Sequence, residues 1–378
     1  MLSPKTNYDF KVLAFYLSWR FKILPMKNVL LTLILLFTFS FSHAQWTKKL
    51  TLPQSELFSF ISAVNNNLVW VLNNNKQIYI SANAGNNWRK INTSGIAGNT
   101  TAKAFFAINE RAALLAVNTD FTGIGPGIIY RTNDTGRTWQ QVFTHEGNCE
   151  FFIDMSTNNA GLMTCSFDSF NGSVKSGQQL FKTLDGGLTW TTNSITDPSN
   201  DFRLLGLEVK NKNAWLVDDN SFYFSKDGAV SWLKQPMPLR GSYYNNLQVV
   251  NSSYAIINES SLINIFVKRP GSNAWMNIGD PTGFGGALTC MVLDSSECWF
   301  ATPFDLPQVF YSNDSAKTFT PQVIDNKSAF SIMVKARNGK NLWGAANFSR
   351  NLWMLERGNG LISQQSHEAD KNNYSVLK

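Results

Sequence analysis

An eight-residue phrase recurs along this chain at nearly regular intervals. Its two full copies read TNDTGRTW and TLDGGLTW, and the other copies are degraded to different degrees. The copies occupy residues 81–88, 132–139, 183–190, 225–232, 268–275 and 312–319. The aromatic residues that end successive copies lie 51, 51, 42, 43 and 44 residues apart. A repeat of this period means that each copy belongs to one supersecondary unit in an array of similar units.

The residues of the phrase favour a β-hairpin. Each of the five better copies follows a short strand-like run, such as GIIYR before Thr132, and leads into another short segment. The Asp or Asn accepts backbone N–H bonds in its own turn, the Gly allows a positive φ, and the aromatic residue packs between units. We therefore predict structural roles for Ser81, Asn83, Gly85, Trp88, Thr132, Asp134, Gly136, Trp139, Thr183, Asp185, Gly187, Trp190, Ser225, Asp227, Trp232, Ser312, Asp314 and Phe319.

The segments between the phrases complete a four-stranded unit. Each unit has an inner apolar strand, a polar turn and a second strand that often carries Trp, as at Trp215 and Trp299. Six units end near residue 323, and a seventh over 330–355 lacks the phrase. Its outer strand is supplied either by residues 46–52 or by residues 361–363. The prediction is an all-β fold, a seven-bladed β-propeller of four-stranded antiparallel blades.

The phrase resembles the Asp-box, or BNR repeat, S/T-x-D-x-G-x-T-W, of sialidase-like β-propellers. In that superfamily the motif lies on the turn between the third and fourth strands, on the face away from the ligand. The resemblance therefore implies that the Asp residues of the phrase are structural. In layout, residues 46–357 are also similar to the photosystem II stability/assembly factor family of exported propellers. Since repeat similarity does not specify a partner, that likeness predicts only a fold and a non-catalytic binding or assembly role.

The N-terminal segment predicts export. A basic residue, Lys27, precedes an apolar run over 29–41, and small residues end at Ala44. Residues 1–44 are interpreted as a signal peptide, with 1–25 either an extension of it or a stretch upstream of a start at Met26. We expect the propeller over 45–357, a polar tail over 358–378, and a periplasmic or extracellular location. The apolar run is short for a membrane span, so no span is expected in the mature chain.

The net charge limits the classes of partner to be expected, and the cysteines raise the question of disulfides. The chain has 33 basic and 26 acidic residues, but the excess is only +3 once residues 1–44 are removed. No charge run indicates nucleic acid or an anionic membrane. An exported chain permits disulfides, and Cys149 and Cys165 flank the first hairpin of blade three, where they either form a disulfide or are small buried residues. Cys290 and Cys298 stand in blade six at shorter spacing.

Catalytic motifs are not found in the sequence. The mature chain retains only His145 and His367, and no zinc, phosphate-loop or calcium-loop spacing occurs. The segment 46–80 contains no Arg, whereas sialidases carry an Arg motif before the first box. We therefore expect no catalytic residue, no metal and no cofactor, although an enzyme is not excluded by sequence alone.

Propeller topology predicts where a ligand would bind. The loops on the face opposite the repeat phrase converge over the central channel, and we select as candidate ligand-binding residues Asp168, Arg203, Arg240, Tyr243, Tyr244 and Asp305. The favoured function is a monomeric module that binds an unknown protein or glycan. The alternative is a sialidase-like glycoside hydrolase, which needs two carboxylates about 5–10 Å apart over the channel, at least one with a raised pKa. A binding module needs instead a patch of Arg and aromatic residues without such a pair.

Overall fold

A computed structural model describes residues 46–357 apart from 92, 120–124, 169–176, 196–203, 239–243, 252, 260–263, 270–271, 273, 281–288, 302–307, 325–329 and 346–349. At 168, 244, 245, 308 and 323 it describes the backbone only. All helical or strand structure in the described residues is β-strand, in seven sheets of four antiparallel strands. No helix in this part of the chain has the length and apolar character needed to cross a membrane.

Six blades are consecutive in sequence, each running from its inner to its outer strand. Blade one is β2 (Phe58–Ala63), β3 (Val69–Asn73), β4 (Ile78–Ser81) and β5 (Arg89–Ile91). Blade two is β6 (Thr101–Ala107), β7 (Ala113–Asn118), β8 (Gly127–Thr132) and β9 (Gln140–His145). Blade three is β10 (Asn148–Met155), β11 (Gly161–Asp168), β12 (Gly177–Thr183) and β13 (Thr191–Asn193). Blade four is β14 (Gly206–Lys210), β15 (Asn213–Val217), β16 (Ser221–Ser225) and β17 (Leu233–Pro236). Blade five is β18 (Tyr244–Asn251), β19 (Tyr254–Glu259), β20 (Asn264–Lys268) and β21 (Trp275–Gly279). Blade six is β22 (Thr289–Val292), β23 (Cys298–Ala301), β24 (Gln308–Ser312) and β25 (Thr320–Val323).

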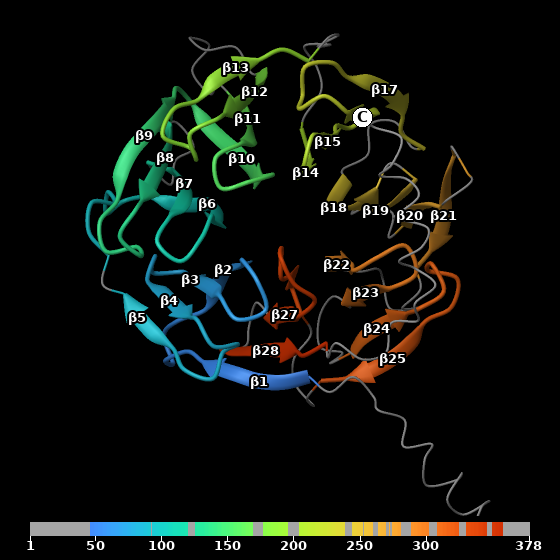
Figure 1. The fold of residues 1–378 in the computed structure, drawn as a ribbon, viewed down its shortest axis with the longest axis horizontal. Helices are drawn as coiled ribbons and strands as arrows, with labels where there is room; N and C mark the ends of the chain where they lie inside the picture. Colours follow the sequence, from blue (N-terminus) through green and yellow to red (C-terminus); the bar gives the residue numbers. More distant parts are fainter. Residues whose placement is uncertain are drawn as a thin grey trace, which may run out of the picture. The chain divides into compact units, whose positions relative to one another are not determined.

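Blade seven is built from both ends of the described chain. Its strands are β26 (Ile332–Lys335), β27 (Leu342–Ala345), β28 (Asn351–Leu355) and, outermost, β1 (Trp46–Thr51). β1 pairs antiparallel with β28, from Trp46 opposite Leu355 to Thr51 opposite Asn351. Of the two predicted alternatives for this outer strand, the structure therefore has the N-terminal one. The inner strands of successive blades are neighbours all the way round, β26 beside β2 included, so the ring is closed (Figure 1). The predicted fold, a seven-bladed β-propeller, is confirmed.

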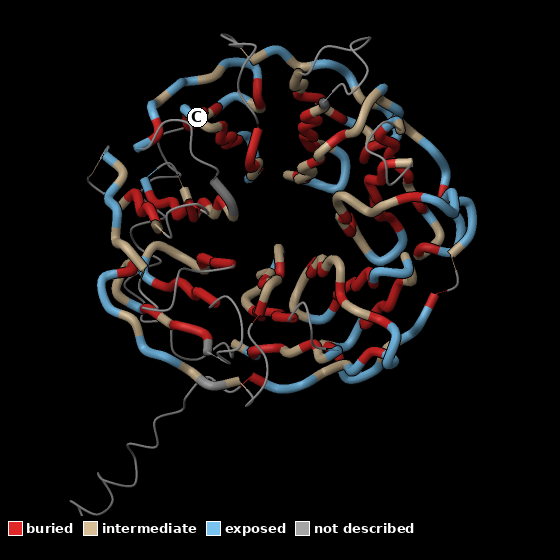
Figure 2. The backbone as a smooth tube through the Cα atoms, turned by 180° about the vertical axis from the view of Figure 1, so that it is seen from behind, coloured by how far each residue is buried: buried red, intermediate tan, exposed pale blue. Residues whose placement is uncertain are grey.

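The core lies between the blades. Buried residues occupy the second and third strands, whereas the outermost strands are largely exposed (Figure 2). β3, β7, β15, β23 and β27 are almost entirely buried because a neighbouring blade covers each of their faces. Trp70, Trp215, Trp299 and Trp343 fill this layer in four blades. Strands that are covered on both faces read as continuous apolar runs, and the second strands do so in sequence.

The repeat phrase forms the turn between the third and fourth strands, as predicted. In the copy of blade three, Thr183 Oγ1 accepts a hydrogen bond from Gly187 N at 2.8 Å and donates one to Asp185 Oδ1 at 2.8 Å. Asp185 also accepts the N–H of Thr189 at 2.9 Å and its hydroxyl at 2.6 Å. In blade two the corresponding hydroxyl bond from Thr138 is the main reason why the pKa of Asp134 is lowered to about 2. The carboxylates of Asp185 and Asp134 therefore accept their hydrogen bonds from donors of their own turns.

Candidate functional site

A cavity of about 740 Å³ lies in the central channel. All seven innermost strands line it, and Figure 1 shows these strands arranged around the axis of the ring. The lining residues come from the C-terminal halves of these strands and from the turns that follow, such as Asn158 after β10 and Asn338 after β26. The volume falls in the range of small-molecule and cofactor sites in proteins, about 300–1,000 Å³.

The cavity lies toward the face that carries the repeat phrase. The turns between first and second strands, which flank the cavity, accept backbone bonds from the phrase turns in five blades. Examples are Gly186 N to Asn159 O at 2.8 Å and Gly228 N to Lys212 O at 2.7 Å. We predicted a site on the opposite face, and the loops there fall largely outside the described residues. That prediction stays a prediction, and the described cavity is an additional candidate.

Two carboxylates line the cavity on adjacent blades. Asp154 Oδ1 accepts the N–H of Met155 at 2.8 Å, and its Oδ2 accepts that of Val209 at 2.7 Å. Burial, with repulsion from Glu208, raises the pKa of Asp154 to about 7. Glu208 Oε2 accepts the N–H of Val249 at 3.1 Å, while its Oε1 lies 2.9 Å from Lys210 Nζ. Since all four oxygens have protein donors, both side chains connect each blade to the next.

Three cations line the same cavity. Lys210 pairs with Glu208 and contacts the Val249 carbonyl. Lys335 Nζ donates to the carbonyl of Leu293 at 2.9 Å, and burial, together with Lys210, lowers its pKa. Arg337 donates through Nη2 to the carbonyls of Ala107 at 2.7 Å and Ile108 at 3.0 Å. Its guanidinium carbon lies 4.4 Å from the ring centre of Phe106, in a cation–π contact.

The charges of this cluster do not balance. Asp154, with a pKa near 7, is about half protonated at neutral pH. Among the described residues, Lys335 and Arg337 bond to neutral carbonyls and make no ion pair. Three basic and two acidic side chains line the cavity, an excess of one positive charge that increases when Asp154 is protonated. Such a site attracts an anionic group more strongly than an exposed cation does.

The residues selected from sequence are only partly described. Asp168 ends β11 and Tyr244 begins β18, so their backbones lie at the blade ends away from the phrase turns. Their side chains, and all of Arg203, Arg240, Tyr243 and Asp305, lie outside the described residues.

The free thiols of Cys149 and Cys165 lie with their sulfurs 2.8 Å apart, and the disulfide stays a prediction.

The charged cluster of the channel was not predicted from the sequence, although a signal was present. Aligning the units on their first two strands, since the seventh unit lacks the phrase, places Asp154, Glu208 and Lys335 near the ends of the inner strands of blades three, four and seven. The corresponding positions elsewhere are mostly small, apolar or amide residues. A charge at the end of a channel-lining strand is unusual enough to be read as a site.

Comparison with known proteins supports the fold and leaves the family open. No protein-family model matches the chain, and no curated protein matches it in sequence. Solved structures do match. A structure of YCF48 bound to D1 peptide has a TM-score of 0.62 at 13% identity, with 84% of this chain and 98% of that one covered. The GH74 xyloglucanase from Xanthomonas campestris has a TM-score of 0.61 at 12% identity, with 85% and 55% covered. A streptogramin B lyase has a TM-score of 0.58 at 12% identity, with 82% and 97% covered. These neighbours share a fold and differ in function, so they do not decide the activity of this chain.

The raised pKa of Asp154 predicts a particular pH dependence. The folded state holds this proton up to about pH 7, whereas an unfolded Asp releases it near 3.8. Because the folded state binds more protons between these values, this group makes stability fall as pH rises from about 4 to 7. Asp154→Asn should flatten that slope, even though it costs one backbone hydrogen bond at all pH values. Thermal unfolding from pH 4 to 8 measures it, and an unchanged slope in the variant would show that Asp154 ionises normally.

Proposed function

We propose that this protein is an exported, non-catalytic binding module that holds a carboxylate-bearing segment of a partner protein in its channel. The observation that carries the proposal is that Lys335 and Arg337 line a cavity of about 740 Å³ and bond there to neutral carbonyls rather than to a carboxylate of the described residues. A peptide carboxylate entering the cavity would replace water around these cations with a charge-assisted partner. Export is expected from the N-terminal segment, and a peptide ligand accords with the YCF48 neighbour, whose structure contains D1 peptide.

Two carboxylates in the channel favour a glycoside hydrolase as the second candidate. Asp154 has a raised pKa and interacts electrostatically with Glu208, and a raised pKa is one property that the acid of such a pair needs. Both side chains, however, have all four oxygens bonded to donors of the protein. A hydrolytic acid needs an oxygen that can reach the glycosidic bond. The hydrogen bonds of Asp154 and Glu208 therefore favour a role of these residues in joining adjacent blades.

A hydrogen-bonded pair of Glu56 and Tyr79 also bears on hydrolysis. Tyr79 donates to Glu56 at 2.6 Å, as a tyrosine nucleophile with a glutamate base would. The Tyr79 side chain is buried in the blade, and burial followed by the bond to Glu56 raises its pKa. Segment 46–80, which holds this pair, contains no Arg to bind a substrate carboxylate. This pair is better explained as a structural network.

A peptide array provides the test of both candidates. The array carries two matched sets of random peptides. Peptides of the first set have free C-terminal carboxylates. Peptides of the second set have no carboxylate, because their C-termini are amidated and Gln and Asn replace Glu and Asp. We expect wild-type protein to select the carboxylate-bearing set and Lys335→Met to lose that selection. Lys317→Met, which removes an exposed cation from a phrase turn, is the matched control and should bind as wild type. Equal binding to both peptide sets would overturn the proposal, and turnover of a glycan panel that Asp154→Asn abolishes would establish the hydrolase instead.

A further inference from the structure

Two cysteines and a histidine meet where blade two passes into blade three. His145 ends β9, Cys149 follows on β10 after a tight connection, and Cys165 lies on the adjacent strand β11. The two sulfurs are 2.8 Å apart, and Cys149 Sγ lies 3.7 Å from His145 Nδ1. Both cysteines are fully buried and His145 is half-buried. This cluster is separate from the channel cavity and from the function proposed for it.

The surroundings make room for the Cys149 sulfur. A side-chain carbon at Gly127 would lie 2.7 Å from both Cβ and Sγ of Cys149, so a larger residue on β8 would displace the thiol. Asn118 holds the backbone of Cys149 from blade two, with Nδ2 donating to its carbonyl at 3.0 Å and Oδ1 accepting its N–H at 3.2 Å. The thiol position is therefore fixed from blade two as well as from its own strand.

A metal centre fits this geometry poorly. Two thiolates on one Zn²⁺ lie about 3.8 Å apart, because each Zn–S bond is about 2.3 Å and the angle is tetrahedral. The two sulfurs here are an ångström closer than that. His145 Nδ1 also lies 2.7 Å from the carbonyl oxygen of Glu146, which can only accept a hydrogen bond. That nitrogen therefore carries a proton and has no lone pair to give to an ion.

The same geometry suits thiol chemistry. A disulfide bond is about 2.05 Å long, so the two sulfurs, 2.8 Å apart, need to approach by less than about 1 Å to be joined. The pKa of Cys149 is lowered to about 6, first by the hydrogen bond from Cys165 and further by His145. The pKa of Cys165 is raised, mainly by the same bond and by burial. The Cys149 thiol therefore ionises more readily and attacks first, while the Cys165 thiol keeps its proton until a second step.

We propose that Cys149 and Cys165 form a reactive thiol–disulfide pair, with Cys149 as the attacking thiolate, Cys165 as the resolving thiol and His145 as the positioning residue. The co-reactant is a low-molecular-weight disulfide. The Cys149 thiolate attacks one of its sulfurs, a mixed disulfide forms, and one small thiolate leaves. Cys165 then gives up its proton and attacks Cys149 Sγ, and the second small thiolate leaves. Two protein thiols are oxidised, one external disulfide is reduced to two thiols, and the protons of the cysteines pass to them.

The burial of Cys149 and Cys165 determines the expected kinetics of their oxidation. External attack requires a local opening between blades two and three, whereas closure follows at once because the sulfurs already lie side by side. The mixed disulfide should therefore not accumulate in the wild type. Cys290 and Cys298 provide an internal control, because they occupy the same diagonal register on β22 and β23. Cys290 there donates to the Asn246 carbonyl at 3.3 Å, and burial raises the pKa values of both thiols.

The experiment incubates reduced, folded protein with oxidised glutathione, followed by alkylation and mass mapping of all four cysteines. We expect one disulfide, Cys149 to Cys165, with Cys290 and Cys298 left as thiols. Cys165→Ser, or Cys165→Ala if the serine variant unfolds, should retain glutathione on Cys149. His145→Gln should give the same product more slowly below pH 8, with its rate profile moved to higher pH by at least one unit. A Cys290→Ser control should react as wild type.

Three results would overturn the proposal. The first is four free thiols in folded protein after prolonged incubation with oxidised glutathione. The second is modification of Cys290 or Cys298 at a rate equal to that of Cys149. The third is a His145→Gln profile identical to the wild type, which would remove the positioning role. Each of these results is independent of whether the channel binds a peptide.

Discussion

Replacing Trp46 with alanine is expected to lower the free energy of unfolding by about 3–5 kcal/mol, the range found for removing a buried Trp or Phe. Trp46 is only 6% exposed although it belongs to the outermost strand of blade seven. Its ring packs edge-on against Trp299 of blade six at 5.8 Å and Phe330 at 4.8 Å. The loss should be large because the residue anchors β1, the strand through which the two ends of the chain close the ring.

Chemical denaturation measured by intrinsic fluorescence tests this expectation. Lys48→Ala on the same strand is the matched control, because its side chain is exposed, and it should change stability by less than about 0.5 kcal/mol. Trp46→Phe should recover part of the loss. If Trp46→Ala were as stable as Lys48→Ala, β1 would not hold the ring, and closure through the N-terminal strand would be wrong.

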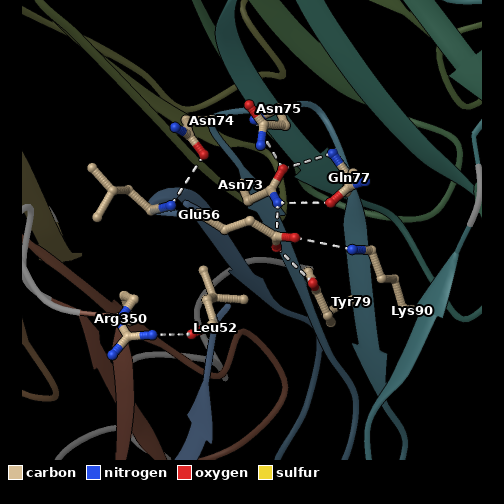
Figure 3. Close-up of polar contacts among 10 residues, drawn as sticks. Leu52, Glu56, Asn73, Asn74, Asn75, Gln77, Tyr79, Lys90 and Arg350 are labelled. Atoms are coloured by element: carbon tan, nitrogen blue, oxygen red, sulfur yellow. Dashed lines mark hydrogen bonds and ion pairs between the residues drawn. The ribbon is translucent and has the colours of Figure 1, made fainter. Parts of the chain in front are cut away.

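Glu56→Ala is expected to cost about 2 kcal/mol, the order found when buried hydrogen-bond donors lose their acceptor. Glu56 lies in the connection from β1 to blade one, beside the contact between Arg350 and Leu52 (Figure 3). Its Oε2 accepts bonds from Asn73 at 2.7 Å and from the hydroxyl of Tyr79 at 2.6 Å. The variant leaves the Tyr79 hydroxyl buried without that acceptor, which is itself unfavourable.

The pH dependence of this network has a defined sign. Burial tends to raise the pKa of Glu56, but the bonds from Tyr79, Lys90 and Asn73 outweigh it and the pKa is lowered. The stability that Glu56 contributes is therefore complete above about pH 4.5 and lost as pH falls through the folded value. Glu150→Ala is the control, since the Glu150 side chain is 42% exposed against 7% for Glu56, and its pair with Lys103 should contribute less than about 1 kcal/mol. A Glu56→Ala variant that loses no more than this control at pH 7 would contradict the account.

The fold could be predicted because its determinants are local and repeated. The turn chemistry of the phrase at Thr132 and Thr183 depends on a few neighbouring residues, so it is readable in sequence and the structure has the expected bonds. The missing seventh phrase, with a strand-like segment beginning at Trp46, indicated closure by the N-terminal strand. The first inference needed only the residues of one unit, whereas the second related the segment 46–52 to a seventh unit that lacks the phrase.

The channel cluster could not be predicted in the same way. Asp154, Glu208, Lys335 and Arg337 belong to three blades and up to 183 residues of sequence separate them, so their proximity follows only from ring closure. Their side-chain partners are backbone groups of adjacent blades, such as Val209 N and Leu293 O, which carry no residue-type signal. The cysteine pair was visible in spacing, whereas the role of His145 depends on the tight connection that folds it back over Cys149.

The affinity of a carboxylate-bearing peptide for the channel tests the central claim most directly. The peptide is a fluorescein-labelled sequence selected on the array, titrated by fluorescence anisotropy at low and high salt. We expect Lys335→Met to weaken binding at least tenfold, Lys317→Met to leave it unchanged, and added salt to weaken the wild type more than Lys335→Met. Equal affinity of the wild type and Lys335→Met at both salt concentrations would contradict a carboxylate site among the cations of the channel.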